Sequence, residues 1–206
     1  MSPIEMPFWI TATQWASRSV LLVLAALSVW SVATMIRCYR QLQEAAGGKD
    51  SGGLFSRLQK QIRDGKLSDI LSLPGTSLYE SVLHEAAGNK VQEPVRIDRS
   101  VKSLLIMKRT EIEKGLTVLA TLGSNAPFIG LFGTVLGIIQ AFGALGTNQG
   151  NGATVMVAIS EALVATAVGL FVAIPAVIAF NFLSRYLRVL ITNCESLRDL
   201  YISQIK

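Results

Sequence analysis

Three apolar stretches dominate this sequence of 206 residues, and each is long enough to cross a lipid bilayer. The first runs from Ser19 to Ile36 without a charged residue, and at about 1.5 Å of rise per residue it spans most of the ~30 Å hydrocarbon core. Two more, at 115–142 and 153–184, are separated by GALGTNQGNG, whose Gly and Asn residues predict a tight turn between antiparallel helices. We therefore expect an all-α membrane protein with three transmembrane helices.

The composition excludes several classes of protein. Half of the residues are apolar, 16% are charged and the mean hydropathy is +0.45, which is too hydrophobic for an ordinary soluble domain. The net charge of +5 suits a protein held against anionic lipids, and no basic patch interleaved with aromatic residues suggests nucleic-acid binding. The two cysteines, Cys38 and Cys194, form no metal-binding motif, so we expect free thiols, no metal and no cofactor.

Lys and Arg residues predict the orientation in the membrane. Residues 37–114 carry 14 basic and 10 acidic side chains, residues 185–206 carry four and two, and residues 143–152 carry none. By the positive-inside rule, the first two of these segments are cytoplasmic. The expected order is a periplasmic N-terminal segment (1–18), transmembrane helix 1 (19–36), a cytoplasmic helical loop (37–114), transmembrane helix 2 (115–142), a periplasmic turn (143–152), transmembrane helix 3 (153–184) and a cytoplasmic tail (185–206).

The cytoplasmic loop is expected to be helical, and its helices to extend from the membrane spans. The segment 47–53, GGKDSGG, suggests a flexible linker, and two short amphipathic helices follow it, divided at Asp64 and Gly65. Another helix is expected to end at Gly88. From near Asp98, apolar residues at helical intervals predict one long helix that continues into the second span. These apolar faces are narrow, so we expect them to pack on each other or on neighbouring subunits.

Glu161 is the only charged residue between Lys114 and Arg185. A carboxylate inside a hydrocarbon-spanning helix costs several kcal/mol unless it faces a protein interior or a wet path. The spans offer no basic residue at membrane depth to pair with it, so Glu161 is the first candidate for a functional residue. The alternative is a carboxyl group that is merely buried, neutral and packed.

Hydroxyl groups at membrane depth could serve such a carboxyl group. Thr134 and Thr166 are the candidates, because a hydroxyl can relay or solvate a proton. The simpler interpretation is that each hydroxyl bonds back to a carbonyl group of its own helix. With Glu161 they form the candidate proton pathway, and no second carboxylate, serine with a base, or histidine cluster indicates an enzyme.

Small residues recur at steps of three or four along the second and third spans. In lipid, such rows let helix backbones approach closely. Pro127 is expected to kink the second span. The residues that we expect at the helix-packing surface are Gly130, Gly133 and Gly137 in the second span, and Ala162, Ala165 and Gly169 in the third.

Two long motifs resemble those of a known family. The runs APFIGLFGTVLGIIQAF at 126–142 and ISEALVATAVGLFVAIPAVIAFN at 159–181 resemble the ExbB, TolQ and MotA family of inner-membrane proton-channel subunits, and the ExbB/TolQ branch most. The resemblance implies a homopentameric ring around a pore that holds a single-span ExbD/TolR-like partner, with a TonB- or TolA-like protein beyond it. By motif, Glu161, Thr134 and Thr166 would line the proton path.

The function expected from this resemblance is to couple the proton motive force to mechanical work through the single-span partner. The motifs do not separate TonB-dependent uptake from Tol-type envelope function, nor protons from sodium as the coupling ion. A different interpretation remains open, namely a non-conducting membrane scaffold that recruits partners through its cytoplasmic helices.

Overall fold

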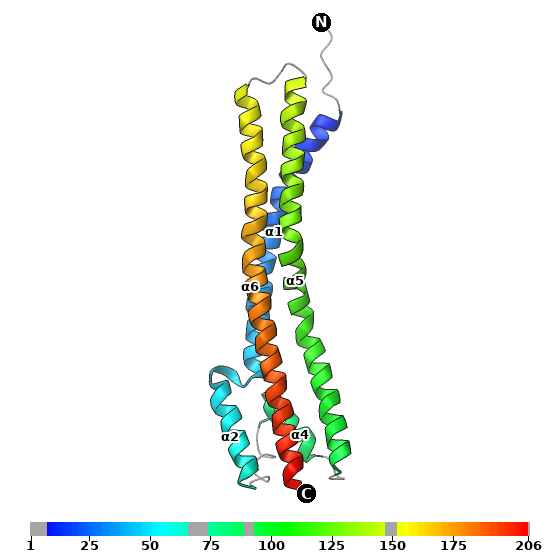
Figure 1. The fold of residues 1–206 in the computed structure, drawn as a ribbon, viewed down its shortest axis with the longest axis vertical. Helices are drawn as coiled ribbons and strands as arrows, with labels where there is room; N and C mark the ends of the chain where they lie inside the picture. The colour runs from blue at the N-terminus through cyan, green and yellow to red at the C-terminus, as the bar shows by residue number, and fades with distance from the viewer. Residues whose placement is uncertain (1–7, 66–73, 89–92, 147–151, 206) are drawn as a thin grey trace. The chain divides into compact units, whose positions relative to one another are not determined.

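The computed structural model describes residues 8–65, 74–88, 93–146 and 152–205 (Figure 1). These residues form five α-helices and one short 3₁₀ helix, and no strand occurs among them. The helices are α1 (Phe8–Ala45), α2 (Ser51–Arg63), α4 (Leu78–Ala87), α5 (Pro94–Gly146) and α6 (Gly152–Ile205), with the 3₁₀ helix η1 at Gly48–Asp50.

Three of the described helices, α1, α5 and α6, are long and apolar enough to cross a membrane. The expected all-α class with three candidate spans is thus confirmed. Each helix extends past the apolar stretch that predicted it, because no Pro or Gly interrupts the charged sequence next to that stretch. The single helix expected from near Asp98 is likewise confirmed, since α5 begins at Pro94 and is 53 residues long.

The chain divides into two compact units. The apolar unit consists of residues 1–35 and 118–180, and the charged unit consists of residues 36–117 and 181–206. In the apolar unit, α1, α5 and α6 bury a common core, to which α1 contributes Val20 and Leu24, α5 contributes Ala126 and Leu136, and α6 contributes Val172 and Ala173. Each helix therefore has one face against the other two, and many of its other large apolar side chains are exposed in the single chain.

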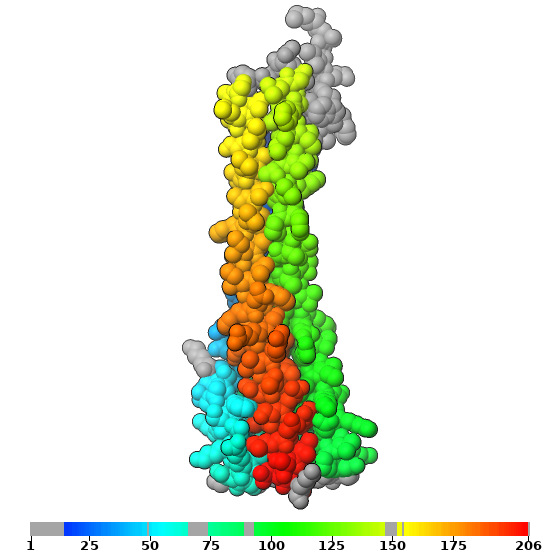
Figure 2. All heavy atoms as spheres, viewed as in Figure 1, coloured from blue at the N-terminus to red at the C-terminus, as the bar shows by residue number. Residues whose placement is uncertain are grey.

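The charged unit has a core of its own, built from α2, α4 and parts of the three long helices. On the face shown in Figure 2, the last turns of α6 lie between α2 and the first turns of α5. Fully buried side chains come from every one of these helices: Leu42, Leu58, Ile62, Val82, Leu83, Ile97, Leu190, Leu197 and Tyr201. The narrow apolar faces of the loop thus pack on each other and on the last turns of α6.

A capping box fixes the start of α4. The Ser77 hydroxyl accepts a hydrogen bond from the backbone N–H of Glu80 at 3.2 Å, and the Glu80 carboxylate accepts one from the N–H of Ser77 at 3.1 Å. The same carboxylate accepts bonds from the N–H and the hydroxyl of Thr76 at 2.8 and 3.2 Å. This buried carboxylate is therefore satisfied by three donors. The expected end of the helix at Gly88 is confirmed, since the Gly88 N–H donates to the carbonyl of His84.

The expectation of a flexible linker at 47–53 was wrong. Gly47 and Gly48 have φ angles of 89° and 83°, and η1 follows at once. Only glycine adopts such angles without strain, so the two glycines form a tight turn. The next two glycines lie in the first turn of α2, where a Cβ atom on Gly53 would collide with the Asp50 carboxylate. Of the two short helices expected after this segment, α2 is present, and the second lies outside the described residues.

Candidate functional site

Glu161 lies on α6, in the apolar unit. It is nine residues from the helix start at Gly152, or about 14 Å along the axis. Its side chain is exposed in the single chain, and no hydrogen bond or ion pair joins it to a described residue. The next residue, Ala162, points the other way and is 3% exposed. The carboxylate thus lies beside the surface where α6 packs on α5, and not within it.

Small residues bring α5 and α6 into close contact next to Glu161. A Cβ atom on Gly137 would collide with Ala162, and one on Gly133 would lie 2.7 Å from the Cβ atom of Ala165. A Cβ atom on Gly130 would lie 2.7 Å from the carbonyl oxygen of Ala165. Side chains at these three glycines would therefore push the two helices apart, and each position has a small residue because the helices are in contact there.

The two threonines differ in what their hydroxyl groups bind. Thr134 is 7% exposed, and its hydroxyl donates to the carbonyl of Leu131 at 2.7 Å, within its own helix. The hydroxyl of Thr166 is buried and has no hydrogen-bond partner among the described residues. Thr134 follows Gly133 and Thr166 follows Ala165, which are in contact, so the two threonines lie at the same helix crossing. Neither hydroxyl is hydrogen-bonded to Glu161.

Prolines occur within α5 and α6, and neither ends its helix. Pro127 lies within α5, and Pro175, which the sequence analysis did not single out, lies within α6. Each proline lacks the N–H that would bond to the carbonyl four residues earlier. The hydroxyl of Ser124 does not satisfy the carbonyl freed by Pro127, because it donates to Thr121 at 3.1 Å.

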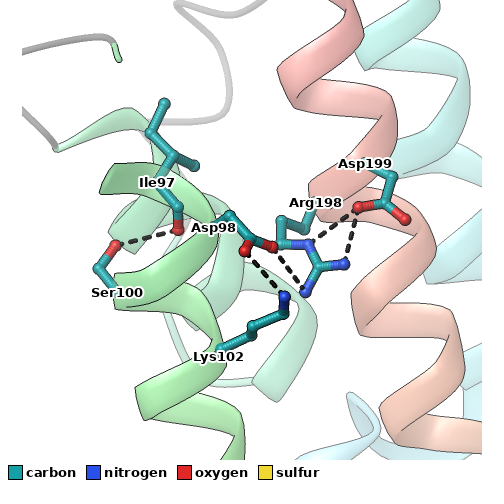
Figure 3. Close-up of polar contacts among 6 residues, drawn as sticks. All are labelled: Ile97, Asp98, Ser100, Lys102, Arg198 and Asp199. Atoms are coloured by element: carbon teal, nitrogen blue, oxygen red, sulfur yellow. Dashed lines mark hydrogen bonds and ion pairs between the residues drawn. The ribbon is translucent and has the colours of Figure 1, made fainter. Parts of the chain in front are cut away.

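A second polar cluster, in the charged unit, was missed by the sequence analysis. Arg198 on α6 is 7% exposed and lies between acidic residues of two helices (Figure 3). Its Nε and Nη2 atoms donate to Asp199 at 2.9 and 2.8 Å, and its Nη1 lies 3.4 Å from a carboxylate oxygen of Asp98 on α5. Lys102 donates to the same carboxylate at 2.8 Å. This hydrogen bond, with the Arg198 charge, holds the pKa of Asp98 below its usual range.

The cysteines are free and buried. Burial raises the pKa of Cys194 to about 12, and the neighbouring Glu195 carboxylate acts in the same direction. This thiol therefore stays protonated and unreactive near neutral pH. Among the described residues, no group of three or more His, Cys, Asp or Glu side chains is placed to hold a metal ion.

These features define a class: an all-helical membrane protein with three candidate spans, closely packed at α5 and α6, and with a single carboxylate in the apolar part of α6. A family model described as the MotA/TolQ/ExbB proton channel family matches residues 73–196. The chain belongs to this family. The matched segment includes α4, the crossing of α5 and α6, and the three residues of the candidate proton pathway.

Curated relatives carry the names of two branches. A "Biopolymer transport protein ExbB" of Neisseria gonorrhoeae is 50% identical over 99 residues, which cover 47% of this chain and 44% of that protein. A "Tol-Pal system protein TolQ" of Pseudomonas aeruginosa is 47% identical over 104 residues, covering 50% of this chain and 45% of that protein. An ExbB of Pseudomonas putida is 34% identical over 177 residues, covering 81% and 54%. The chain thus matches about half the length of these relatives.

Proposed function

We propose that this chain is an inner-membrane proton-channel subunit that couples the proton motive force to mechanical work through a single-span ExbD/TolR-like partner. The observation that carries the proposal is the position of Glu161, the one charged side chain in the apolar part of α6, beside the crossing of α5 and α6. This position lies within the segment that matches the proton channel family. The relatives named ExbB and TolQ support a role in a TonB-dependent or a Tol-type system.

The exposure of Glu161 supports an assembly in which another chain covers it. An ionised carboxylate facing lipid is costly, so the side chain requires a protein neighbour or a water-filled path. A ring of five copies with the partner helices in its pore would supply both. Large apolar side chains that are exposed on α5 and α6 in the single chain would then meet neighbouring copies or lipid, among them Phe128, Leu131, Phe132, Leu163 and Phe171.

In this proposal, the carboxyl group alternately takes up and releases a proton as the ion moves down the membrane potential. That potential supplies about 2.3 kcal/mol per elementary charge per 100 mV. The buried hydroxyl of Thr166, which has no partner among the described residues, is free to donate to a water molecule or carboxylate on the path, whereas the Thr134 hydroxyl is already bonded to its own helix. We also propose that the N terminus is periplasmic and that residues 37–114 and 185–206 are cytoplasmic, on the distribution of Lys and Arg.

The test is proton uptake into liposomes that contain this chain together with its single-span partner. Glu161→Gln keeps the shape of the side chain and removes its titratable group, so we expect an assembled complex with no proton uptake above the background of empty liposomes. Glu195→Gln is the matched control, because it makes the same change at an exposed position of α6 in the charged unit. That variant should conduct as the wild type does.

Equal uptake by Glu161→Gln and the wild type would contradict the proposal. It would favour the alternative of a non-conducting scaffold that recruits partners through its cytoplasmic helices. The assembled amount is measured for each variant by size-exclusion chromatography, so that a loss of uptake is not confused with a loss of the complex.

A further inference from the structure

A small hollow opens in the charged unit where α1, the turn before α2 and α6 meet. Its volume is about 310 Å³, at the lower end of the range of about 300–1,000 Å³ usual for ligand pockets. The lining is aromatic on two sides and polar on the third: Tyr39 and Gln43 from α1, Gly48 and Ser51 from the turn and α2, and Phe182 and Tyr186 from α6. Both tyrosines can offer a hydroxyl group to a polar ligand at the rim of an apolar surface.

The hollow lies where the apolar stretches of two helices end. Tyr39 is three residues beyond Ile36, the end of the first apolar stretch, and Phe182 and Tyr186 flank the end of the third at 184. Aromatic side chains are enriched at this level, because one part of the ring contacts lipid tails and the other contacts headgroups. A ligand in the hollow would therefore be at the boundary between the hydrocarbon and the aqueous phase.

Two arginines flank the hollow at helical spacing. Arg40 is three residues before Gln43, and Arg185 is three residues after Phe182, so each is a surface neighbour of a lining residue. Both side chains are exposed, and neither has an ion pair with a described residue. These cations are therefore available to a ligand.

The adjoining part of α6 lacks acidic residues, whereas on α1 Glu44 directly follows the lining residue Gln43 and is four residues from Arg40. The sequence contains no Asp or Glu at 8–43 or at 162–194. Glu44 and Asp50 line a separate hollow of about 580 Å³, which shares only Gly48 with the first. The charge beside the smaller hollow is thus positive on its α6 side, which complements an anion.

We propose that this hollow binds the headgroup of an anionic phospholipid, with Arg40 and Arg185 on its phosphate and the tyrosine hydroxyls at its polar edge. Phosphatidylglycerol is an anionic phospholipid of this kind. Two guanidinium groups bind a phosphate well because each presents a planar set of N–H donors. This lipid would hold the α1 and α6 sides of the charged unit together at the membrane boundary.

The test titrates the full chain, in an uncharged detergent, with phosphatidylglycerol and with phosphatidylcholine, and counts bound lipids by native mass spectrometry. The wild type should bind one phosphatidylglycerol per chain in a saturable manner and phosphatidylcholine much more weakly. Each arginine near an anionic headgroup contributes about fivefold in affinity, so the double variant Arg40→Gln/Arg185→Gln should bind about 25-fold more weakly.

The matched control is Arg37→Gln/Arg188→Gln. It removes the same two charges from the same helices, but each position is two residues from a lining tyrosine and thus lies on the opposite side of its helix. This variant should bind as the wild type does. Equal weakening in the two double variants would overturn the proposal, because it would indicate general attraction to anionic lipid. So would equal binding of the two lipids by the wild type.

A third variant tests the hollow separately from its charges. Ser51 is a half-buried lining residue at the start of α2, and Ser51→Tyr would fill the space while keeping both arginines. We expect it to lose the bound phosphatidylglycerol. If it retains one lipid with the affinity of the wild type, the headgroup does not occupy this hollow and the proposal is wrong.

Discussion

Gly130 on α5 and Gly169 on α6 face each other with no side chain between them. A Cβ atom on Gly130 would lie 3.3 Å from the Cα atom of Gly169, and one on Gly169 would lie 3.1 Å from the Cα atom of Gly130. The same added atoms would lie 2.7 Å from the carbonyl oxygens of Ala165 and Ala126, respectively. Because these neighbours are backbone atoms, the helices themselves would have to move to admit even a methyl group.

We therefore expect Gly169→Ala to destabilise the chain by about 1–3 kcal/mol, the usual cost of overpacking. Gly169→Leu should separate α5 from α6 and disperse any oligomer that depends on their packing. Thermal unfolding in detergent measures the first effect, and size-exclusion chromatography with light scattering measures the second. Gly146→Ala is the control, since a Cβ atom there meets nothing within 4 Å. Equal melting temperatures for Gly169→Ala and Gly146→Ala would contradict the close contact.

The Arg198 cluster predicts a stability effect within the charged unit. Arg198→Ala removes the charge between Asp98 and Asp199 and leaves a cavity, so we expect a loss of about 2 kcal/mol, typical of hydrogen bonds to charged groups. Hydrogen–deuterium exchange should rise in the first turns of α5 and the last turns of α6. Arg188→Ala is the control, because that side chain is exposed on the same helix. If Arg198→Ala and Arg188→Ala have the same free energy of unfolding, the ion pairs of Arg198 contribute nothing to stability.

The lowered pKa of Asp98 predicts how this contribution depends on pH. The usual value is 3.8, and the hydrogen bond from Lys102 and the Arg198 charge lower it in the folded state. A carboxyl group whose pKa is depressed by folding stabilises the fold above its unfolded pKa, and that stabilisation is lost as the pH falls through the folded value. The stability difference between the wild type and Asp98→Asn should thus be constant from pH 7 to about pH 5 and shrink below about pH 4.

Thermal unfolding of the two proteins at pH 6, 4.5 and 3 checks this expectation. The difference between them isolates Asp98, because the remaining carboxylates titrate in both proteins. A difference that instead grew below pH 4 would mean that the folded state prefers the protonated carboxyl group. That outcome would be incompatible with the contacts of Lys102 and Arg198.

Local patterns in the sequence were sufficient to predict most of the helices. The part of α5 before the second span follows from apolar residues at helical spacing with no Pro or Gly between Pro94 and Gly115. The capping box of α4 was also visible, as a serine followed three residues later by a glutamate, Ser77 and Glu80, although the sequence analysis did not use it. Such signals depend on only a few neighbouring residues, so they can be recognised in the sequence before the fold is known.

Contacts between distant segments could not be predicted in this way. Arg198 and Asp98 are 100 residues apart, and many carboxylates of the charged unit were equally plausible partners. The row of small residues indicated close packing but did not identify Gly169 as the residue opposite Gly130. The burial of Leu197 and Tyr201 was not predicted for the same reason, because they belong to a tail whose packing depends on the fold.

The two threonines at the helix crossing predict opposite effects on stability. The Thr134 hydroxyl donates to Leu131, so Thr134→Val loses one hydrogen bond and should cost about 0.5–1.5 kcal/mol. The Thr166 hydroxyl is buried without a partner among the described residues, so Thr166→Val removes an unpaired polar group at nearly constant shape. We expect Thr166→Val to leave stability unchanged or to raise it, because an unsatisfied buried hydroxyl costs about 1–3 kcal/mol.

The same pair of variants separates a structural role from a role in the proposed proton pathway. If the Thr166 hydroxyl serves the path, Thr166→Val should lower proton uptake by the assembled complex at least tenfold while its melting temperature stays at or above that of the wild type. Thr134→Val should have the opposite pattern, namely a lower melting temperature and a smaller effect on proton uptake than Thr166→Val. A Thr166→Val complex that melts normally and conducts fully would exclude this hydroxyl from the path, and Glu161 would then have to act without it.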